Sequence, residues 1–483
     1  MLSSYEVNSG GRLYHGGVVL KEHHLVGREG VWVLFRVREM AAIRISPLLA
    51  SAIARLPPNG LIADRLMQEL RGCHLVADAD AEAGRPSQGG AAAAIALPVR
   101  AILFLAQTCT MRCIYCYGDG GEYGESGLMT AATARAAVDW LMAHCGDARQ
   151  VSIGFFGGEP LLNMAVLKQV VDYAKKRAAE RTMAIAFTVN TNGSLLDDAI
   201  AEYLARESIH VRISFDGPRD VQNRQRPFAN GQGSYEQVVA RLPLLRRQMP
   251  LRAVRATVCG NSDPFAVRQG LEDVGFTACT LDAASPMVGH EAGRTERDAG
   301  PPAQVPEQLA LRMLAYRRDE VARYFTAVRS RRLDLESPCV LTGLLSALAT
   351  GRRNHSACGA GRGLRAVSAA GEVYPCHRFV GHREFQMGRL EDDPAAVPND
   401  CHRVFVDTIP ACSSCPVRYL CGGGCLYHNW AVTGDLRQVD PVRCRERRVI
   451  CEELIHGWAM LSAAERAYFR EQATRLYPET QGA

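Results

Sequence analysis

The sequence predicts an α/β protein. Its largest unit is a partial (β/α)6, TIM-like barrel between a small N-terminal winged-helix-like domain and a C-terminal cysteine-rich domain. Short apolar segments alternate with amphipathic segments between residues 99 and 300, which is typical of parallel βα repeats. Strand-like and then helix-like segments occupy residues 1–80. Most of the 17 cysteines fall in a tight group at 109–116 or between 339 and 451, which indicates two metal-bearing regions.

The composition is that of an ordinary globular protein, with 47% hydrophobic and 22% charged residues in 483. The net charge of +5 is spread along the chain and gives no signal for nucleic-acid binding. We find no secretory signal and no apolar run of about 18 residues, so we expect a cytoplasmic protein without a membrane partner. Cytosolic thiols stay reduced, so the grouped cysteines indicate cluster or metal binding rather than disulfides.

The N-terminal 80 residues predict one buried strand at Val31–Val37 and two helices, at Ile45–Leu56 and Leu61–Leu70. The breaker Pro57-Pro58-Asn59-Gly60 separates the helices, and residues 79–90 form a Gly/Ala-rich linker.

In the barrel we expect apolar strands that are each followed by a helix. The strands are expected at 101–106, 151–156, 184–190, 211–216 and 255–260, and the helices at 130–145, 163–179, 195–206, 234–248 and 264–273. Five or six such units without a Gly-x-Gly-x-x-Gly turn favour a barrel over a dinucleotide-binding fold.

The rest of the chain divides by composition. A breaker-rich loop at 286–304 precedes a linker helix in 301–337, which we place at 305–328. A cysteine-rich domain follows at 338–455, and a C-terminal helix at 456–483; helical periodicity returns over 446–472.

The first chemical motif is Cys109-x3-Cys113-x2-Cys116, directly after the first barrel strand. Three thiolates on one loop can bind three irons of a [4Fe–4S] cube and leave the fourth iron open to a ligand. A zinc knuckle is the alternative, but zinc needs a fourth Cys or His at matching spacing, and none follows within the loop.

With this motif the sequence resembles the radical S-adenosylmethionine (SAM) superfamily. The resemblance implies that Cys109, Cys113 and Cys116 hold the cluster, and that the amine and carboxylate of SAM bind its open iron. It also implies that Tyr115, before the last cysteine, packs near the adenine.

The second barrel strand ends in Gly157-Gly158-Glu159-Pro160. Glycines allow a close backbone approach, and Glu159 can accept from an ammonium group. In the family this motif holds the methionine amine of SAM, whereas a plain βα turn is the structural alternative.

Short polar side chains follow the next two strands, as expected of a ligand rim. By resemblance, Ser214 and Arg226 contact the carboxylate or ribose of SAM. Asn190 and Asp216 are further candidates, for which a turn-capping role fits equally well.

The second motif is Cys412-x2-Cys415-x5-Cys421-x3-Cys425, with Cys444 beyond it. Together with Cys358 and Gly371-x4-Cys376 upstream, it resembles the SPASM domain of peptide-modifying radical SAM enzymes, although a zinc ribbon has a related pattern. The resemblance implies two auxiliary [4Fe–4S] clusters. The ligands of the first are Cys358, Cys376, Cys425 and, as the fourth, Cys339; the ligands of the second are Cys412, Cys415, Cys421 and Cys444. Cys401 and Cys451 are the alternative ligands if one of these assignments fails.

Two SPASM subgroups compete. Sulfatase-maturing enzymes carry an Asp after the cysteine of the G-x4-C motif, where this chain has His377. Thioether-forming peptide maturases share the segments 116–124, 358–361 and 375–381. Among them the chain is most similar to the maturases of the quinohemoprotein amine dehydrogenase small subunit, which join cysteine sulfur to a carbon of Asp or Glu.

The resemblance also implies partners. We expect a polypeptide substrate with cysteines, whose leader adds as a strand to the N-terminal domain, and an electron donor such as flavodoxin or ferredoxin. Candidate proton acceptors are His377, Asp282 and Glu122. A formylglycine-forming sulfatase maturase and a non-catalytic metal-binding scaffold remain the alternatives.

Overall fold

The computed structural model of the chain describes residues 3–5, 13–14, 18–56, 62–78, 97–249, 253–285, 288, 306–333, 340–392 and 399–476. The linker expected at 79–90, most of the loop expected at 286–304, and Cys339 lie outside the described residues.

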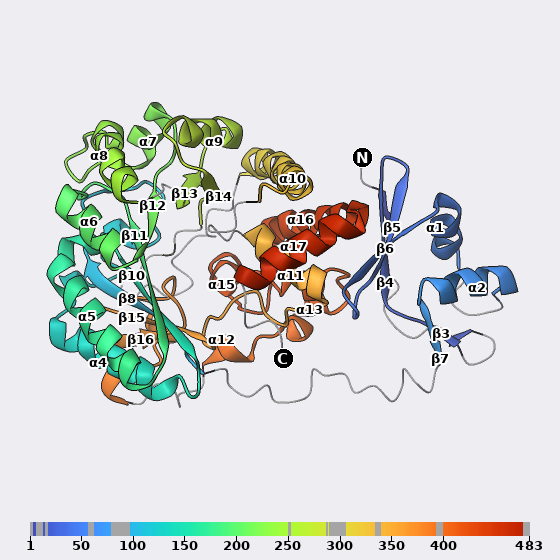
Figure 1. Cartoon of the computed structure of the whole chain (residues 1–483), viewed down its shortest axis with the longest axis horizontal. Coiled ribbons are helices and arrows are strands. Elements are labelled where there is room, and N and C mark those ends of the chain that lie inside the picture. The colour runs from blue at the N-terminus through green and yellow to red at the C-terminus, as the bar shows by residue number, and fades with distance from the viewer. Residues whose placement is uncertain are drawn as a thin grey trace.

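The largest unit is a curved parallel sheet with helices on its outer side (Figure 1). The parallel strands, in spatial order, are β14 (Ala278–Ala283), β13 (Ala253–Val258), β12 (His210–Ser214), β11 (Ala184–Thr191), β10 (Gln150–Gly157) and β8 (Arg100–Gln107). The helices are α4 (Ala131–His144), α5 (Met164–Glu180), α6 (Asp198–Arg206), α7 (Arg219–Gln225), α8 (Tyr235–Gln248) and α9 (Pro264–Asp273). These six strands confirm the predicted partial barrel; the sequence did not give residue ranges for β14 or α7.

Local sequence explains where these helices begin. Thr130 accepts a hydrogen bond from the Thr133 backbone N–H at 3.1 Å, and Asp197 accepts one from Ile200 at 2.7 Å. Such side chains satisfy donors that the first helical turn leaves unpaired. The strands alternate with the helices to form one apolar core.

The cysteine-rich region extends the barrel sheet. Its strands are β15 (Leu364–Val367), β16 (Glu372–Tyr374) and β17 (Gly388–Arg389), and β9 (Gly127–Leu128) pairs with β8. Strand β15 runs parallel to β8, with Leu364 opposite Arg100 and Val367 opposite Leu103. The C-terminal region therefore contributes strands to the barrel sheet instead of standing apart from it.

Helices form the rest of the C-terminal region. They are α10 (Glu307–Arg329), α11 (Val340–Thr350), α12 (Asp400–Arg403), α13 (Pro410–Ser413), α14 (Arg418–Cys421), α15 (Leu426–Thr433), α16 (Pro441–Met460) and α17 (Ala463–Leu476). The 3₁₀ helices of the chain are η1 (Asp119–Gly121), η2 (Pro160–Asn163), η3 (Arg383–Phe385), η4 (Leu390–Asp392) and η5 (Val406–Thr408). Helix α16 runs through residue 455, where we expected a domain to end, and the helix break lies at Leu461.

The N-terminal unit contains two small sheets and two helices. One sheet has the order β1 (Ser3–Tyr5), β4 (His23–Arg28), β5 (Val31–Arg36), β6 (Ala41–Ile45); the other has β2 (Leu13–Tyr14), β3 (Val18–Leu20), β7 (Val76–Asp78); the helices are α1 (Pro47–Ala54) and α2 (Asp64–Gly72). Six of its strands precede both helices. The winged-helix-like assignment stays a prediction.

The N-terminal unit packs on the C-terminal helices, which lie between it and the barrel in Figure 1. Glu22 and Arg418 form a buried ion pair, in which Nη2 donates to Oε2 at 2.6 Å. His24 contacts Glu452 at 3.0 Å. Among the described residues, no helix combines the length and apolar character that a bilayer crossing requires.

Candidate active site

The loop that follows β8 carries the first three predicted cysteine ligands. Backbone hydrogen bonds from Arg112 to the Pro227 carbonyl (2.8 Å) and from Ile114 to the Gln225 carbonyl (3.0 Å) hold this loop against the segment after α7. Cys109, Cys113 and Cys116 all line one cavity of about 170 Å³ at the carboxyl ends of the strands.

The three thiols influence one another. Burial and then the nearby Glu159 raise the pKa of Cys109 to about 12, and the thiolates of Cys113 and Cys116 add to this increase. Burial also raises the pKa of Cys113. A positive metal centre would favour the thiolate forms of Cys109 and Cys113, which burial disfavours. Three thiols on one wall of a cavity fit the predicted cluster with an open iron.

The glycine turn after β10 packs directly under the cysteine loop. A Cβ atom at Gly157, where φ is 124°, would lie 2.1 Å from the Ala106 carbonyl oxygen. A Cβ atom at Gly158 would lie 2.2 Å from the Thr108 carbonyl oxygen and 3.0 Å from the Cys109 Cβ. Only glycine fits at both positions, and the backbone of both lines the cavity.

Glu159 ties strand ends together beneath the cavity. Its buried carboxylate accepts hydrogen bonds from Thr191 Oγ1 (2.8 Å) and from the backbone N–H groups of Leu161 (3.0 Å) and Asn192 (2.8 Å). Burial raises its pKa to about 7. The carboxylate is not part of the cavity wall, so its contact with a SAM ammonium stays a prediction.

Tyr115, Asp216 and Arg226 form one buried polar group. The Tyr115 hydroxyl donates to Asp216 Oδ2 at 2.6 Å and accepts from Arg226 Nη1 at 2.6 Å. Burial raises the pKa of Asp216, which Arg226 opposes. Tyr115 and Arg226 line the cavity, whereas Asp216 holds them from below. Asn190 and Ser214 also line the cavity, as the sequence predicts for a ligand rim.

The sequence analysis missed a concentration of positive charge in this cavity. Arg212, Arg255 and Arg378 line it together with Arg226, and Asp282 is the only carboxylate among the lining residues that the structure describes. Arg212 and Arg255 belong to strands β12 and β13. Arginines in otherwise apolar barrel strands were the available signal, because a buried charge needs a functional or paired role.

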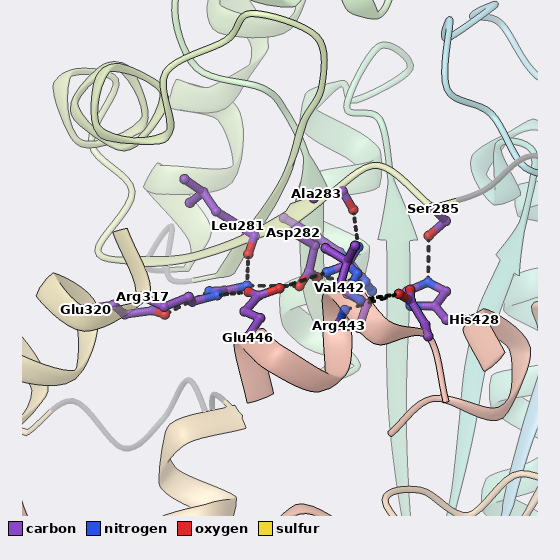
Figure 2. Close-up of polar contacts among 12 residues, drawn as sticks. Leu281, Asp282, Ala283, Ser285, Arg317, Glu320, His428, Val442, Arg443 and Glu446 are labelled. Carbon is purple, nitrogen blue, oxygen red and sulfur yellow. Dashed lines mark hydrogen bonds and ion pairs between the residues drawn. The ribbon is translucent and has the colours of Figure 1, made fainter. Parts of the chain in front are cut away.

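Asp282 lies at the junction between the barrel and the C-terminal helices. It accepts from Arg255 at 2.9 Å and from Arg317 of α10 at 3.2 Å. Figure 2 shows Arg317 also reaching Glu446 and the Leu281 carbonyl, and Arg443 of α16 reaching the Ala283 carbonyl. The end of β14 is thus bound to both helices.

The three candidate proton acceptors differ in placement. Burial would raise the pKa of Asp282, but Arg255 and Arg317 hold it below its ordinary value, which makes it a weak base. Glu122 faces Arg112 at 3.7 Å, and its side chain is 44% exposed and outside the cavity lining. His377 lines the cavity, and its buried Nδ1 has no partner among the described residues, although burial and then Arg378 lower its pKa as well. Of the three, geometry favours His377.

The predicted auxiliary ligands gather into two groups. In the first group, burial and then the Cys425 thiolate raise the pKa values of Cys358 and Cys376. In the second, burial and then the thiolates of Cys421 and Cys415 raise the pKa values of Cys412 and Cys444. The described members of the two predicted sets thus lie in separate groups, and Cys339, the fourth ligand predicted for the first set, lies outside the described residues.

Two further thiols lie beside these groups. Cys401 influences Cys376 of the first group, and Cys451 lies near Cys421 and Cys415 of the second. In the described part of the chain, no three Cys, His, Asp or Glu side chains meet closely enough to bind a single metal ion. In a cubane cluster each thiolate binds a different iron, so its ligands need not meet at one point.

Comparison with known proteins agrees with this geometry. Residues 103–260 match the sequence profile of the Radical SAM superfamily. The chain is 21% identical over 336 residues to a cysteine-type anaerobic sulfatase-maturating enzyme of Clostridium novyi, covering 66% of this chain and 84% of that enzyme. It is 28% identical over 157 residues to the radical SAM cyclopropyl synthase TigE of Paramaledivibacter caminithermalis, covering 30% of this chain and 32% of that enzyme.

Two other matches differ in coverage. An uncharacterized protein of Methanocaldococcus jannaschii is 34% identical over 133 residues, which is 28% of this chain and 43% of that protein. The match thus spans less than half of that relative and of TigE. A solved structure of native anSMEcpe with bound AdoMet shares the fold, with a TM-score of 0.60 at 18% identity over 75% of this chain and all of that one.

Residues 103–260 thus match the radical SAM superfamily, and the chain is similar to a sulfatase-maturating enzyme and to a cyclopropyl synthase of that class. The radical SAM match implies SAM and one [4Fe–4S] cluster as cofactors. The three thiols and the glycine turn are the residues that would hold them.

Replacing Cys113 tests the cluster assignment. We expect Cys113→Ala protein, reconstituted anaerobically, to contain about four fewer irons per chain than the unaltered protein and to cleave no SAM. Cys145→Ala is the matched control, because Cys145 is buried at the end of α4, away from the cavity. Equal iron contents in the unaltered protein and both variants would contradict the assignment.

Gly158→Ala tests the packing of the turn against the cysteine loop. The added methyl group meets backbone atoms, and overpacking of this kind costs about 1–3 kcal/mol. We expect SAM affinity, measured by equilibrium dialysis, to fall about tenfold or more. Gly127→Ala is the control, because a Cβ atom there has no neighbour within 4 Å. Unchanged SAM affinity in Gly158→Ala would rule out the close packing described above.

Proposed function

We propose that this protein is a radical SAM peptide maturase that forms thioether crosslinks between cysteine sulfur and a side-chain carbon of the same polypeptide. One observation carries the proposal. A single cavity is lined both by the three thiols of the barrel loop and by His377 and Arg378, which directly follow the predicted auxiliary ligand Cys376. A substrate in this cavity would lie between the predicted barrel cluster and the first of the two predicted auxiliary clusters.

The crosslink removes two hydrogens from the peptide. When bound, SAM and the barrel cluster would supply a radical that takes one hydrogen atom from the acceptor carbon. An auxiliary cluster would take up the one electron that is released when the carbon–sulfur bond forms. The thiol proton goes to a base in the cavity, for which His377 is the best-placed side chain of the candidates. An external donor such as flavodoxin or ferredoxin would supply the electron that is needed for the reductive cleavage of SAM.

The charge of the cavity supports an acidic acceptor residue. Arg226 is held by Tyr115 near the predicted SAM site, which leaves Arg212, Arg255 and Arg378 toward the substrate. Arg378 Nη1 donates to Ser285 Oγ at 2.7 Å, and the Arg378 Cζ lies 4.8 Å from the centroid of the Tyr117 ring, so the guanidinium group is held in position. Arginines preorganised in this way bind carboxylates well, as an Asp or Glu acceptor would require.

The N-terminal unit is proposed to bind the leader of the substrate. Strand β6 is an edge strand of the described four-stranded sheet, and a peptide can add to such an edge by main-chain hydrogen bonds. Ion pairs such as Glu22–Arg418 fix this unit to the cysteine-rich domain. We propose the small subunit of quinohemoprotein amine dehydrogenase as the substrate.

Formylglycine formation is the second candidate, because the chain is similar to a sulfatase-maturating enzyme over 336 residues. His377 occupies the position after Cys376 where the resemblance to sulfatase-maturing enzymes implies an Asp. This difference favours the crosslinking reaction.

A peptide assay tests the proposal. The reconstituted protein, SAM and a reductant are incubated with a leader-containing peptide that holds one Cys and one Asp. We expect a loss of two hydrogens, a thiol that no longer reacts with iodoacetamide, and one deoxyadenosine per crosslink. The Cys113→Ala variant serves as the control. An aldehyde at the cysteine position would instead identify the formylglycine reaction.

Arg255→Met tests recognition of the acidic acceptor. A hydrogen bond between charged groups contributes about 1.5–3 kcal/mol, so a short Asp-containing core peptide should bind at least about tenfold more weakly. The matched peptide with Asn in place of Asp should bind equally to both proteins. The affinities of the two peptides are measured by a competition binding assay, and SAM is present throughout. An equal loss for both peptides would show that Arg255 does not recognise the carboxylate.

A further inference from the structure

A further thiol, that of Cys401, lies near the first auxiliary group of Cys358, Cys376 and Cys425. From the sequence, Cys401 is only an alternative ligand. Cys401 lies in the short helix α12 and is fully buried. The fourth ligand expected from the sequence, Cys339, lies outside the described residues. The contacts of Cys401 therefore decide whether it can complete the group.

Three backbone segments meet at Cys401. A Cβ atom at Gly361, three residues after Cys358, would lie 3.0 Å from the Cys401 Cβ. The Gly361 N–H donates to the Pro375 carbonyl at 3.0 Å, directly before Cys376. Asn399, which caps α12, donates to the Gly361 carbonyl at 3.3 Å. The turn at Gly361 thus contacts the segments that carry Cys376 and Cys401.

The fourth segment carries Cys425. A Cβ atom at Gly422 would lie 2.6 Å from the Ala357 backbone nitrogen, next to Cys358. Gly422 has no Cβ and a φ of 78°, and the missing side chain permits this close approach. The thiolates of Cys358 and Cys425 also add to the effect of burial on the pKa of Cys401. The four segments that carry Cys358, Cys376, Cys401 and Cys425 therefore lie next to one another.

Two buried arginines supply an independent observation. Arg362 is 9% exposed and Arg365 is 1% exposed, and neither forms an ion pair with a carboxylate in the described part of the chain. Nε and Nη1 of Arg362 and Nε of Arg365 lack hydrogen-bond partners there. Both guanidinium groups lie near the Cys401 thiol.

Buried cations without a counter-ion are strongly unfavourable. A [4Fe–4S] cube with four thiolates carries a net negative charge, which the neighbouring cations would offset. The unpaired arginines thus point to an anionic group at this place, larger than a single thiolate.

We propose that Cys401 is the fourth ligand of the first auxiliary [4Fe–4S] cluster, with Cys358, Cys376 and Cys425. The inference rests on the auxiliary clusters of the proposed function. A cluster with four protein thiolates has no open iron, so it accepts electrons but does not bind the substrate sulfur. Arg362 and Arg365 then act as positioning residues that stabilise the reduced state.

Iron analysis and EPR spectroscopy test this assignment without relying on catalysis. Unaltered protein and the variants Cys401→Ala, Cys339→Ala and Cys145→Ala are reconstituted anaerobically. Saturating SAM blocks the open iron of the barrel cluster, and the reduced proteins are then treated with cyanide. We expect about twelve irons and no cyanide-induced EPR change in the unaltered protein, in Cys339→Ala and in Cys145→Ala.

The Cys401→Ala variant should either lose about four irons or gain a cyanide-dependent EPR change at an opened site. If it fails to fold, Cys401→Ser keeps the side-chain volume and should shift the EPR signal of one cluster. If Cys339→Ala instead showed the iron loss or the cyanide-dependent EPR change, and both Cys401 variants did not, the assignment of Cys401 would be overturned. The auxiliary clusters themselves would not be refuted by that result. About four irons in the unaltered protein would refute the auxiliary clusters as well.

Discussion

The parallel pairing of β15 with β8 is the constraint on which the site depends. Strand β8 ends in the loop that carries the three barrel cysteines, and β15 leads into the β16 strand that ends directly before Pro375 and Cys376. Because β16 runs antiparallel to β15, the segment with Cys376 leaves the sheet near the amino end of β8, whereas the barrel loop follows its carboxyl end, and one cavity reaches both segments. Loss of this register would separate the barrel loop from His377 and Arg378, and the shared cavity would no longer exist.

Several weaker contacts keep this arrangement in place. The Gln107 side chain at the end of β8 accepts from the Ala369 N–H at 2.7 Å, between β15 and β16. At the far side of the barrel, Arg317 and Arg443 bind the end of β14 to the C-terminal helices, and Arg443 adjoins the predicted ligand Cys444. The cysteine-rich region is thus held at both ends of the parallel sheet, which supports a chemistry that needs two redox centres at fixed separation.

Sequence reasoning predicted what local pattern encodes. The alternation of apolar segments gave the barrel strands, and the spacing of Cys109, Cys113 and Cys116 gave the loop that lines the cavity. It could not predict the β8–β15 pairing, because strand pairing between segments about 260 residues apart leaves no local pattern. The roles of Arg212 and Arg255 were missed for a different reason: each is a single arginine in an apolar strand, a signal whose meaning appears only when the fold places both around one cavity.

The most direct test follows hydrogen from the peptide. A substrate carrying deuterium on the side-chain methylene carbon of its Asp acceptor is incubated with reconstituted protein, SAM and reductant, and the released deoxyadenosine is analysed by mass spectrometry. The account predicts that deuterium enters deoxyadenosine from the acceptor carbon. Deuterium transfer only from a substrate labelled at the cysteine β-carbon would contradict it, since the hydrogen would then leave the sulfur-bearing residue.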